Sequence, residues 1–142
     1  MKTRLLLVDD EREFVDTLAL RLEARGFLVD TAYAGDAALI KATNKDFDVI
    51  VLDVLMPGRS GLDTLRELKV VKPITEVILL TGHATVQTAI DGMKLGAYDF
   101  LMKPMEIDDL VDKVTRAHAR KAEQDERIRQ AAIQQITQTR GW

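Results

Sequence analysis

The stretch VLDVLMPG, residues 51–58, joins an apolar run to a carboxylate and then to a Pro-Gly turn. The apolar run covers residues 49–52, and Asp53 follows it directly. A continuous apolar run of this length is typical of a strand that is buried on both faces of a parallel sheet. Because a carboxylate at the end of a buried strand is costly without a partner or a task, Asp53 marks a candidate functional site.

Similar short apolar runs alternate with longer amphipathic stretches from the first residues to about residue 118. The predicted strands are residues 5–8, 27–29, 49–52, 77–80 and 100–102. Apolar residues at spacings of three and four predict a helix after each strand, with one apolar face. These residues are Phe14, Leu18 and Leu22; Ala38 and Ala42; Leu62, Leu65 and Leu68; Val86, Ile90 and Met93; and Ile107, Leu110 and Val114. The pattern predicts the α/β class, as one doubly wound (βα)5 domain.

Chains with this alternation commonly form a flavodoxin-like parallel sheet of five strands in the order 2-1-3-4-5, and we take that order from known folds of this class. Ligands of such sheets bind outside the carboxyl ends of the strands, where the strand order reverses. The residues that follow the predicted strands there are Asp9, Asp10, Asp53, Thr81 and Lys103. Since the first and third strands are neighbours in this order, we expect the three aspartates to converge.

Three converging carboxylates repel one another and cannot all stay ionised without a positive charge among them. Lys103 supplies one charge. A cluster of oxygen ligands without His or Cys also suits Mg²⁺, which binds carboxylates, waters and phosphate oxygens. This chemistry fits a phosphoryl acceptor, in which Asp53 attacks phosphorus, Mg²⁺ and Lys103 neutralise the phosphoryl oxygens, and the Thr81 hydroxyl hydrogen-bonds one of them.

On these residues the chain resembles the receiver domains of two-component response regulators. The resemblance runs from residue 3 to about 118 and rests on VDDE (8–11), VLDVLMPGRSG (51–61), LLTGHA (79–84) and GAYDFLMKP (96–104). It implies that Asp53 is phosphorylated by a sensor histidine kinase. It also implies that Asp9 or Asp10, together with Asp53 and the backbone carbonyl of Leu55, holds Mg²⁺.

The resemblance further implies a conformational switch. In such domains phosphorylation draws in the hydroxyl at the Thr81 position, and the aromatic at the Phe100 position follows. The surface of the fourth helix, fifth strand and fifth helix then changes. A homodimer could form through this surface, or another partner could bind to it. Tyr98 is expected to share the face of Phe100 by strand alternation. The bond between Lys103 and Pro104 is expected to be cis, which X-Pro bonds tolerate.

Three alternatives compete with this interpretation. A phosphatase of the haloacid dehalogenase type also uses an aspartyl phosphate, but that family wants an acid two residues after the nucleophile, where this chain has Leu55. A flavin binder of the same topology would want a Gly/Ser/Thr-rich phosphate loop where this chain has DDERE, residues 9–13. Asp9 and Asp10 could also simply cap the first helix. His83 lies near where a hydrolytic water could approach, and Thr85 could cap the fourth helix.

The composition narrows the class of protein. With 142 residues, 46% hydrophobic residues and 30% charged residues, the chain suits one ordinary globular domain. A net charge of −3 and the lack of a Lys/Arg-rich run give no electrostatic footprint for nucleic acid or an anionic membrane. There is no cysteine, and the N-terminal apolar run is too short for a signal peptide, so we expect a cytoplasmic protein.

The composition becomes polar and Gln-rich beyond residue 119. We expect a receiver domain over residues 1–119 and a helical extension over residues 120–142, which continues the fifth helix. Ile128, Ala132 and Ile136 form a thin apolar stripe, but Lys121 and Gln124 break a clean heptad. We interpret the extension as a solvated linker towards an output domain absent from this chain; dimerisation through a coiled coil is the alternative.

Overall fold

The computed structural model describes residues 2–82 and 86–139 of the chain. Five parallel strands form one sheet in the order β2-β1-β3-β4-β5. Their bounds are β1 Arg4–Val8, β2 Leu28–Ala32, β3 Val49–Asp53, β4 Glu76–Thr81 and β5 Asp99–Met102. The predicted fold class and strand order are therefore confirmed.

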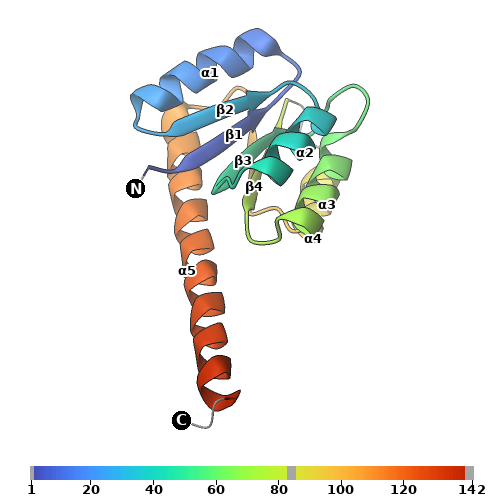
Figure 1. Cartoon of the computed structure of the whole chain (residues 1–142). Coiled ribbons are helices and arrows are strands. Elements are labelled where there is room, and N and C mark those ends of the chain that lie inside the picture. The colour runs from blue at the N-terminus through green and yellow to red at the C-terminus, as the bar shows by residue number, and fades with distance from the viewer. Residues whose placement is uncertain (1, 83–85, 140–142) are drawn as a thin grey trace.

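Helices cover both faces of this sheet (Figure 1). They are α1 Arg12–Ala24, α2 Gly35–Asn44, α3 Gly61–Val71, α4 Val86–Lys94 and α5 Ile107–Thr139. Strand residues alternate between the two faces. Leu6, Ile50 and Leu79 pack in the core beneath α2 and α3, whereas Leu7 and Val51 pack in the core beneath α1 and α5. The central strands are continuously apolar because both of their faces are buried.

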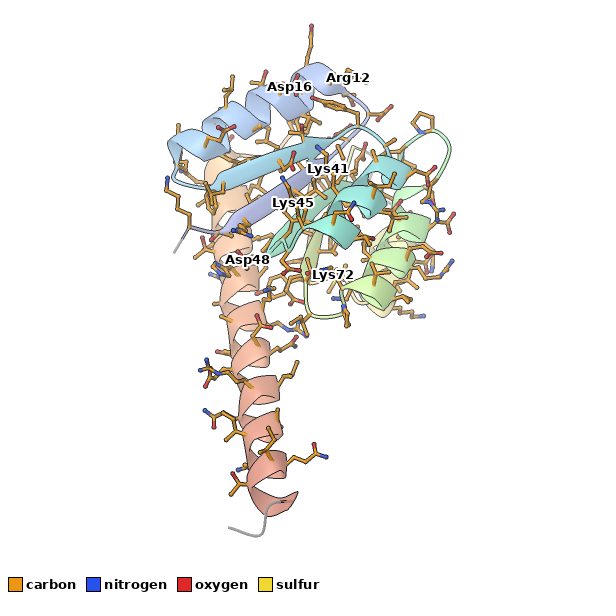
Figure 2. All side chains as sticks on the ribbon, in the orientation of Figure 1. Arg12, Asp16, Lys41, Lys45, Asp48 and Lys72 are labelled. Carbon is orange, nitrogen blue, oxygen red and sulfur yellow. The ribbon has the colours of Figure 1, made fainter. Side chains whose placement is uncertain are left out.

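Strand β2 is longer than predicted. The apolar run suggested residues 27–29, whereas the strand extends to residue 32. Since β2 is an edge strand, it tolerates a polar residue that a central strand would exclude. Asp30 lies in this part of the strand, with the ammonium groups of Lys41 and Lys45 at 2.8 and 3.1 Å from its carboxylate oxygens; Figure 2 shows both lysines beside β2.

The predicted apolar face of α4 is exposed, and one prediction about β5 was wrong. Ile90 and Met93 lie 41% and 43% exposed on α4, so this apolar face is not covered by the core. Tyr98 does not share the face of Phe100: it packs in the core beneath α1 and α5, and Phe100 packs in the opposite core. Tyr98 lies before β5 begins, where the alternation of a strand does not apply.

Helix α5 continues far beyond the sheet, as the sequence predicted (Figure 1). It is 33 residues long, and its last residue buried against the sheet is Ala117. The isoleucines of the projecting part, Ile128, Ile133 and Ile136, are half-exposed. Among the residues that the structure describes, no helix is long and apolar enough to cross a membrane.

Candidate functional site

Three aspartates meet at the carboxyl end of the sheet. Asp9 and Asp10 follow β1, and Asp53 is the last residue of the neighbouring strand β3. Each offers a carboxylate oxygen, and these oxygens lie within 4.8 Å of one another. Asp9 and Asp53 are buried, whereas Asp10 is exposed. The structure therefore brings together the three carboxylates that the strand order predicted.

Lys103 reaches this acidic site from the turn after β5. Its ammonium group donates a hydrogen bond to Asp9 and lies 3.8 Å from Oδ2 of Asp53. Its backbone N–H donates to the carbonyl of Thr81 at 2.7 Å, and its bond to Pro104 is cis, as expected. This one ammonium group contacts two of the three clustered carboxylates, so the negative charge of the site exceeds the charge that neutralises it.

Burial and, next, the neighbouring Asp9 carboxylate together raise the pKa of Asp53 to about 6, against the opposing effect of Lys103. The pKa of Lys103 is raised, although its ammonium group is partly buried. Burial alone would lower it, but the hydrogen bond to Asp9 and the charge of Asp53 outweigh that effect and raise it. Lys103 therefore stays positive at neutral pH, and Asp53 is mostly ionised there and easily protonated in mild acid.

The loop after β3 is shaped by two glycines. Gly58 has a φ of +76°, a conformation that other residues rarely adopt. Gly61 begins α3 against the preceding strand, and a Cβ there would lie 2.2 Å from the carbonyl oxygen of Asp53. This close approach holds the start of α3 against the end of β3, where the N–H of Gly61 donates to the carbonyl of Val54 at 2.9 Å. The backbone N–H of Leu55 then donates to Oδ1 of Asp53 at 3.3 Å, while the Leu55 side chain points into solvent.

The two residues assigned to the switch lie on neighbouring strands. Thr81 is the buried last residue of β4 and therefore ends at the same edge as Asp53. Phe100, in β5, is partly buried against the core beneath α2 and α3. His83 and Thr85 lie outside the described residues.

The helix-cap alternative for Asp9 does not account for this geometry. Asp9 accepts a hydrogen bond from the backbone N–H of Glu11 at 3.0 Å, but Glu11 precedes α1, whose own N-cap position has no side-chain hydrogen bond. The contact of Asp9 with Lys103 from the far end of the sheet is independent of α1.

Two neighbours of Lys103 were not predicted. Oε1 of Glu11 lies 3.8 Å from the ammonium nitrogen, and the ring of Phe14 lies beneath it, with its centroid at 4.4 Å. An ammonium group over an aromatic face is attracted by the electron density of the ring. The hydrophobic spacing predicts Phe14 only as part of the apolar face of α1. Its position one turn after the acidic motif was the available signal.

The donor set of the site fits Mg²⁺. All three side chains offer carboxylate oxygens, two of them from buried residues, and hard divalent cations prefer oxygen ligands. Asp10, being exposed, can bind through water, as Mg²⁺ sites commonly do. The excess negative charge and the raised pKa of Asp53 are the properties expected of carboxylates placed to receive a cation.

Comparison with known proteins agrees with this geometry. The family described as "Response regulator receiver domain" matches residues 5–115. The transcriptional regulatory protein ZraR of Salmonella typhimurium is 33% identical over 135 residues, which are 95% of this chain and 31% of ZraR. The chain thus spans about a third of the length of this relative.

Solved structures give the same result. A receiver domain protein from Clostridium thermocellum superimposes with a TM-score of 0.81 at 37% identity, covering 84% of this chain and 97% of that one. NtrX from Brucella abortus, solved with ADP, superimposes with a TM-score of 0.85 at 31% identity, covering 98% of this chain and 33% of NtrX. The chain therefore belongs to the family of response regulator receiver domains, the receivers of two-component signal transduction.

Proposed function

We propose that Asp53 accepts a phosphoryl group from a sensor histidine kinase in a reaction that depends on Mg²⁺. The observation that carries the proposal is the convergence of three carboxylates within 4.8 Å beside the ammonium group of Lys103, in a chain of this family. We assign the metal ligands to Asp9, Asp10 and Asp53 and to the backbone carbonyl of Leu55. When bound, Mg²⁺ would supply positive charge for the oxygens of the incoming phosphoryl group.

The residues of the chain perform the remaining steps. A carboxylate oxygen of Asp53 attacks phosphorus, and the bond from phosphorus to the donor's leaving group breaks, with its electron pair staying on the leaving group. Lys103 is held near Asp53 by Asp9, so its ammonium group can stabilise the charge of the transferred oxygens. The Thr81 hydroxyl hydrogen-bonds one of these oxygens. In this proposal the protein catalyses its own phosphorylation and a slow dephosphorylation.

The side chain at position 55 supports a receiver rather than a phosphatase. Leu55 is 63% exposed and carries no acid, although it lies two residues after the nucleophile, where such a phosphatase places its general acid. Its backbone N–H contacts Asp53, but its side chain cannot move a proton. We therefore expect the aspartyl phosphate to persist long enough to be recognised by a partner.

The exposed apolar face of α4 and β5 supports a place for that recognition. Ile90 and Met93 of α4 and Met102 of β5 are each more than 40% exposed. We propose that movement of Thr81 and Phe100 after phosphorylation changes this surface of α4, β5 and α5. A second copy of the chain or an output partner would bind there, and the projecting part of α5 is a second possible dimer contact.

The remaining proposals concern the protein's setting. We assign residues 1–119 to the receiver domain and residues 120–142 to a helical connection towards an output domain. ZraR and NtrX are much longer than this chain, which supports such a connection. A cytoplasmic location, without direct binding of nucleic acid, is supported by the absence of cysteine and by the net charge of −3.

The test is phosphorylation by a small donor. The protein with Mg²⁺ and acetyl phosphate should gain the mass of one phosphoryl group, stable in acid and labile in base, by intact-protein mass spectrometry. Asp53→Asn should gain none. Asp112→Asn is the matched control, because Asp112 lies exposed on α5 and pairs only with Arg116 at 3.3 Å among the described residues. Equal labelling of Asp53→Asn and the parent would refute the assignment, and rapid release of phosphate over many turnovers, without accumulation of the labelled protein, would indicate the phosphatase.

A further inference from the structure

A buried carboxylate lies at the edge of the sheet opposite the acidic site. Glu76 is the first residue of β4 and is 3% exposed. Its Oε1 lies 3.7 Å from the ammonium group of Lys69 on α3, and its Oε2 lies 3.2 Å from Nε of Arg120 on α5. Oε2 has no hydrogen bond within the described part of the chain, so its main compensation is the charge of Arg120. The phosphoryl transfer proposed above makes no use of this group.

A second carboxylate faces the next residues of α5. Asp48, just before β3, accepts a hydrogen bond from the backbone N–H of Arg4 at 2.8 Å. Its Oδ1 lies 3.4 Å from the ammonium group of Lys121 and 3.7 Å from Nε2 of His118. The other ring nitrogen of His118 is hydrogen-bonded to the Thr3 hydroxyl at 2.8 Å. Figure 2 shows Asp48 where α5 passes the end of the sheet.

These contacts define what we call the α5 clamp. It consists of Thr3, Asp48 and Glu76, at the starts of β1, β3 and β4, and of His118, Arg120 and Lys121 on α5. The clamp follows directly after Ala117, the last residue of α5 buried against the sheet. From residue 122 to residue 138 nearly every position of the helix is exposed. The clamp is therefore the last described group of contacts before the helix projects from the domain.

The clamp also selects one register of the helix. A shift by four residues would bring Ala122, Gln124 and Asp125 to the positions of His118, Arg120 and Lys121. Asp125 would then face Asp48, and Glu76 would lose the cation beside its Oε2. Leaving a buried charge without its partner is strongly unfavourable, so the observed register is the one in which the sheet's acids are paired.

We propose that the α5 clamp fixes the direction in which the helical extension leaves the receiver domain. The orientation of whatever follows the extension then depends on six residues at the edge of the sheet far from Asp53. This proposal does not depend on the phosphorylation of Asp53, because it rests on contacts among other residues. It treats the clamp residues as positioning residues for the extension and assigns them no catalytic role.

The experiment uses the full chain, which contains no cysteine and so accepts two unique spin labels. We place them at Val70→Cys, exposed on α3, and at Gln135→Cys, exposed on the extension. Electron–electron double resonance then measures the distribution of distances between them. Labelled chains are diluted in unlabelled protein, so that only distances within one chain are recorded. The parent should give one narrow distribution.

Two variants open the clamp from its two sides. Arg120→Gln with Lys121→Gln removes the cations of the helix, and Asp48→Asn with Glu76→Gln removes the acids of the sheet. Each should at least double the width of the distance distribution, and combining all four should add little, because each double variant already breaks the same contacts. Far-ultraviolet circular dichroism and a cooperative urea transition show whether the domain of each variant remains folded.

The matched control is Glu126→Gln with Arg129→Gln, which removes an ion pair of 2.7 Å inside the extension itself. It should leave the width of the distribution unchanged. An unchanged width in both clamp variants would overturn the proposal. Equal broadening in the control would also overturn it, because the direction of the helix would then depend on its own helical stability and not on the clamp.

Discussion

The two edges of the sheet show two ways of placing charge at strand ends. At the carboxyl edge, three carboxylates share one ammonium group, and the pKa of Asp53 is raised to about 6. At the opposite edge, the carboxylates of Asp48 and Glu76 face three cationic side chains, Lys69 from α3 and Arg120 and Lys121 from α5. The carboxyl edge therefore has an excess of negative charge, whereas cations balance the negative charge of the carboxylates at the opposite edge.

This difference separates a binding site from a structural contact. A cluster with unbalanced charge is costly for the folded state until a cation or a phosphoryl group with its metal arrives, so it is suited to binding. A balanced cluster is stabilised only in the arrangement that pairs its charges, so it is suited to fixing geometry. Replacing an acid by its amide should consequently have opposite effects on stability at the two edges.

The largest change in stability is expected at the balanced edge. Glu76→Gln removes the buried charge that Lys69 and Arg120 compensate, and Lys69 is itself largely buried. Breaking a buried pair in this way should lower the free energy of unfolding by about 3 kcal/mol. Urea unfolding at pH 8 measures this change in the free energy of unfolding. Asp112→Asn, the same loss of charge at an exposed pair, is the control and should change little.

The same chemical change at the unbalanced edge should stabilise the protein. Without Mg²⁺ at pH 8, Asp53→Asn removes a carboxylate whose ionisation is opposed in the folded chain, and it should raise the free energy of unfolding by about 1–3 kcal/mol. The folded parent keeps this proton up to about pH 6, and the unfolded chain only up to its ordinary pKa of 3.8. The parent therefore loses stability as the pH rises between these values.

Urea unfolding at a series of pH values tests this sign. The advantage of Asp53→Asn should be full above about pH 6 and should vanish below about pH 4. A variant that is less stable than the parent at pH 8 would show that Asp53 is compensated after all, and the contrast between the two edges would fail.

Addition of Mg²⁺ should reverse this order. A cation that binds only the folded chain stabilises it by about 2.7 kcal/mol at a hundred times its Kd. The parent should gain this stability at pH 8, and Asp53→Asn should gain much less. The gain should shrink as the pH falls below about 6, because a proton on Asp53 competes with the metal. Thermal unfolding with and without Mg²⁺ measures both effects.

Asp48→Asn separates metal binding from a general response to divalent cations. Asp48 lies at the balanced edge, where Lys121 already compensates it. Its replacement should leave the gain from Mg²⁺ intact. If the stabilisation by Mg²⁺ disappeared in Asp48→Asn but persisted in Asp53→Asn, the metal would bind at the edge of Asp48, and the assignment of the metal site to Asp53 would be wrong.

The carboxyl edge could be predicted from the sequence, and the opposite edge could not. Parallel strands of known order bring their carboxyl ends together, so Asp9 and Asp53 could be placed without coordinates. Glu76 and Asp48 precede the strands predicted from the sequence, residues 77–80 and 49–52, and look there like ordinary loop acids. Their partners Arg120 and Lys121 lie in a stretch whose composition predicts a solvated linker. The contact depends on the angle at which α5 crosses the sheet, which no periodicity in the sequence records.

The same reason explains the smaller errors. Hydrophobic spacing predicts that α4 has an apolar face, but it cannot say whether another element of the chain covers that face, and Ile90 remains exposed. Alternation predicts the facing of a residue only inside a strand, and Tyr98 lies just outside β5. A polar residue inside an edge strand interrupts the apolar run, so the predicted strand ends too early, as it does before Asp30 in β2. Each error concerns tertiary packing and not the identity of an element.

The smallest effects are expected within α5, where one substitution can be compared at two places. Arg120→Gln breaks the contact with buried Glu76, whereas Arg129→Gln breaks only the exposed pair with Glu126. The urea midpoint should fall clearly for Arg120→Gln, by less than for Glu76→Gln, because Lys69 still faces the acid. It should not change measurably for Arg129→Gln, because exposed pairs contribute little. Equal midpoints for the two arginine variants would show that Arg120 is an ordinary surface residue, and only the contacts of His118 and Lys121 would then connect the balanced edge to the projecting helix.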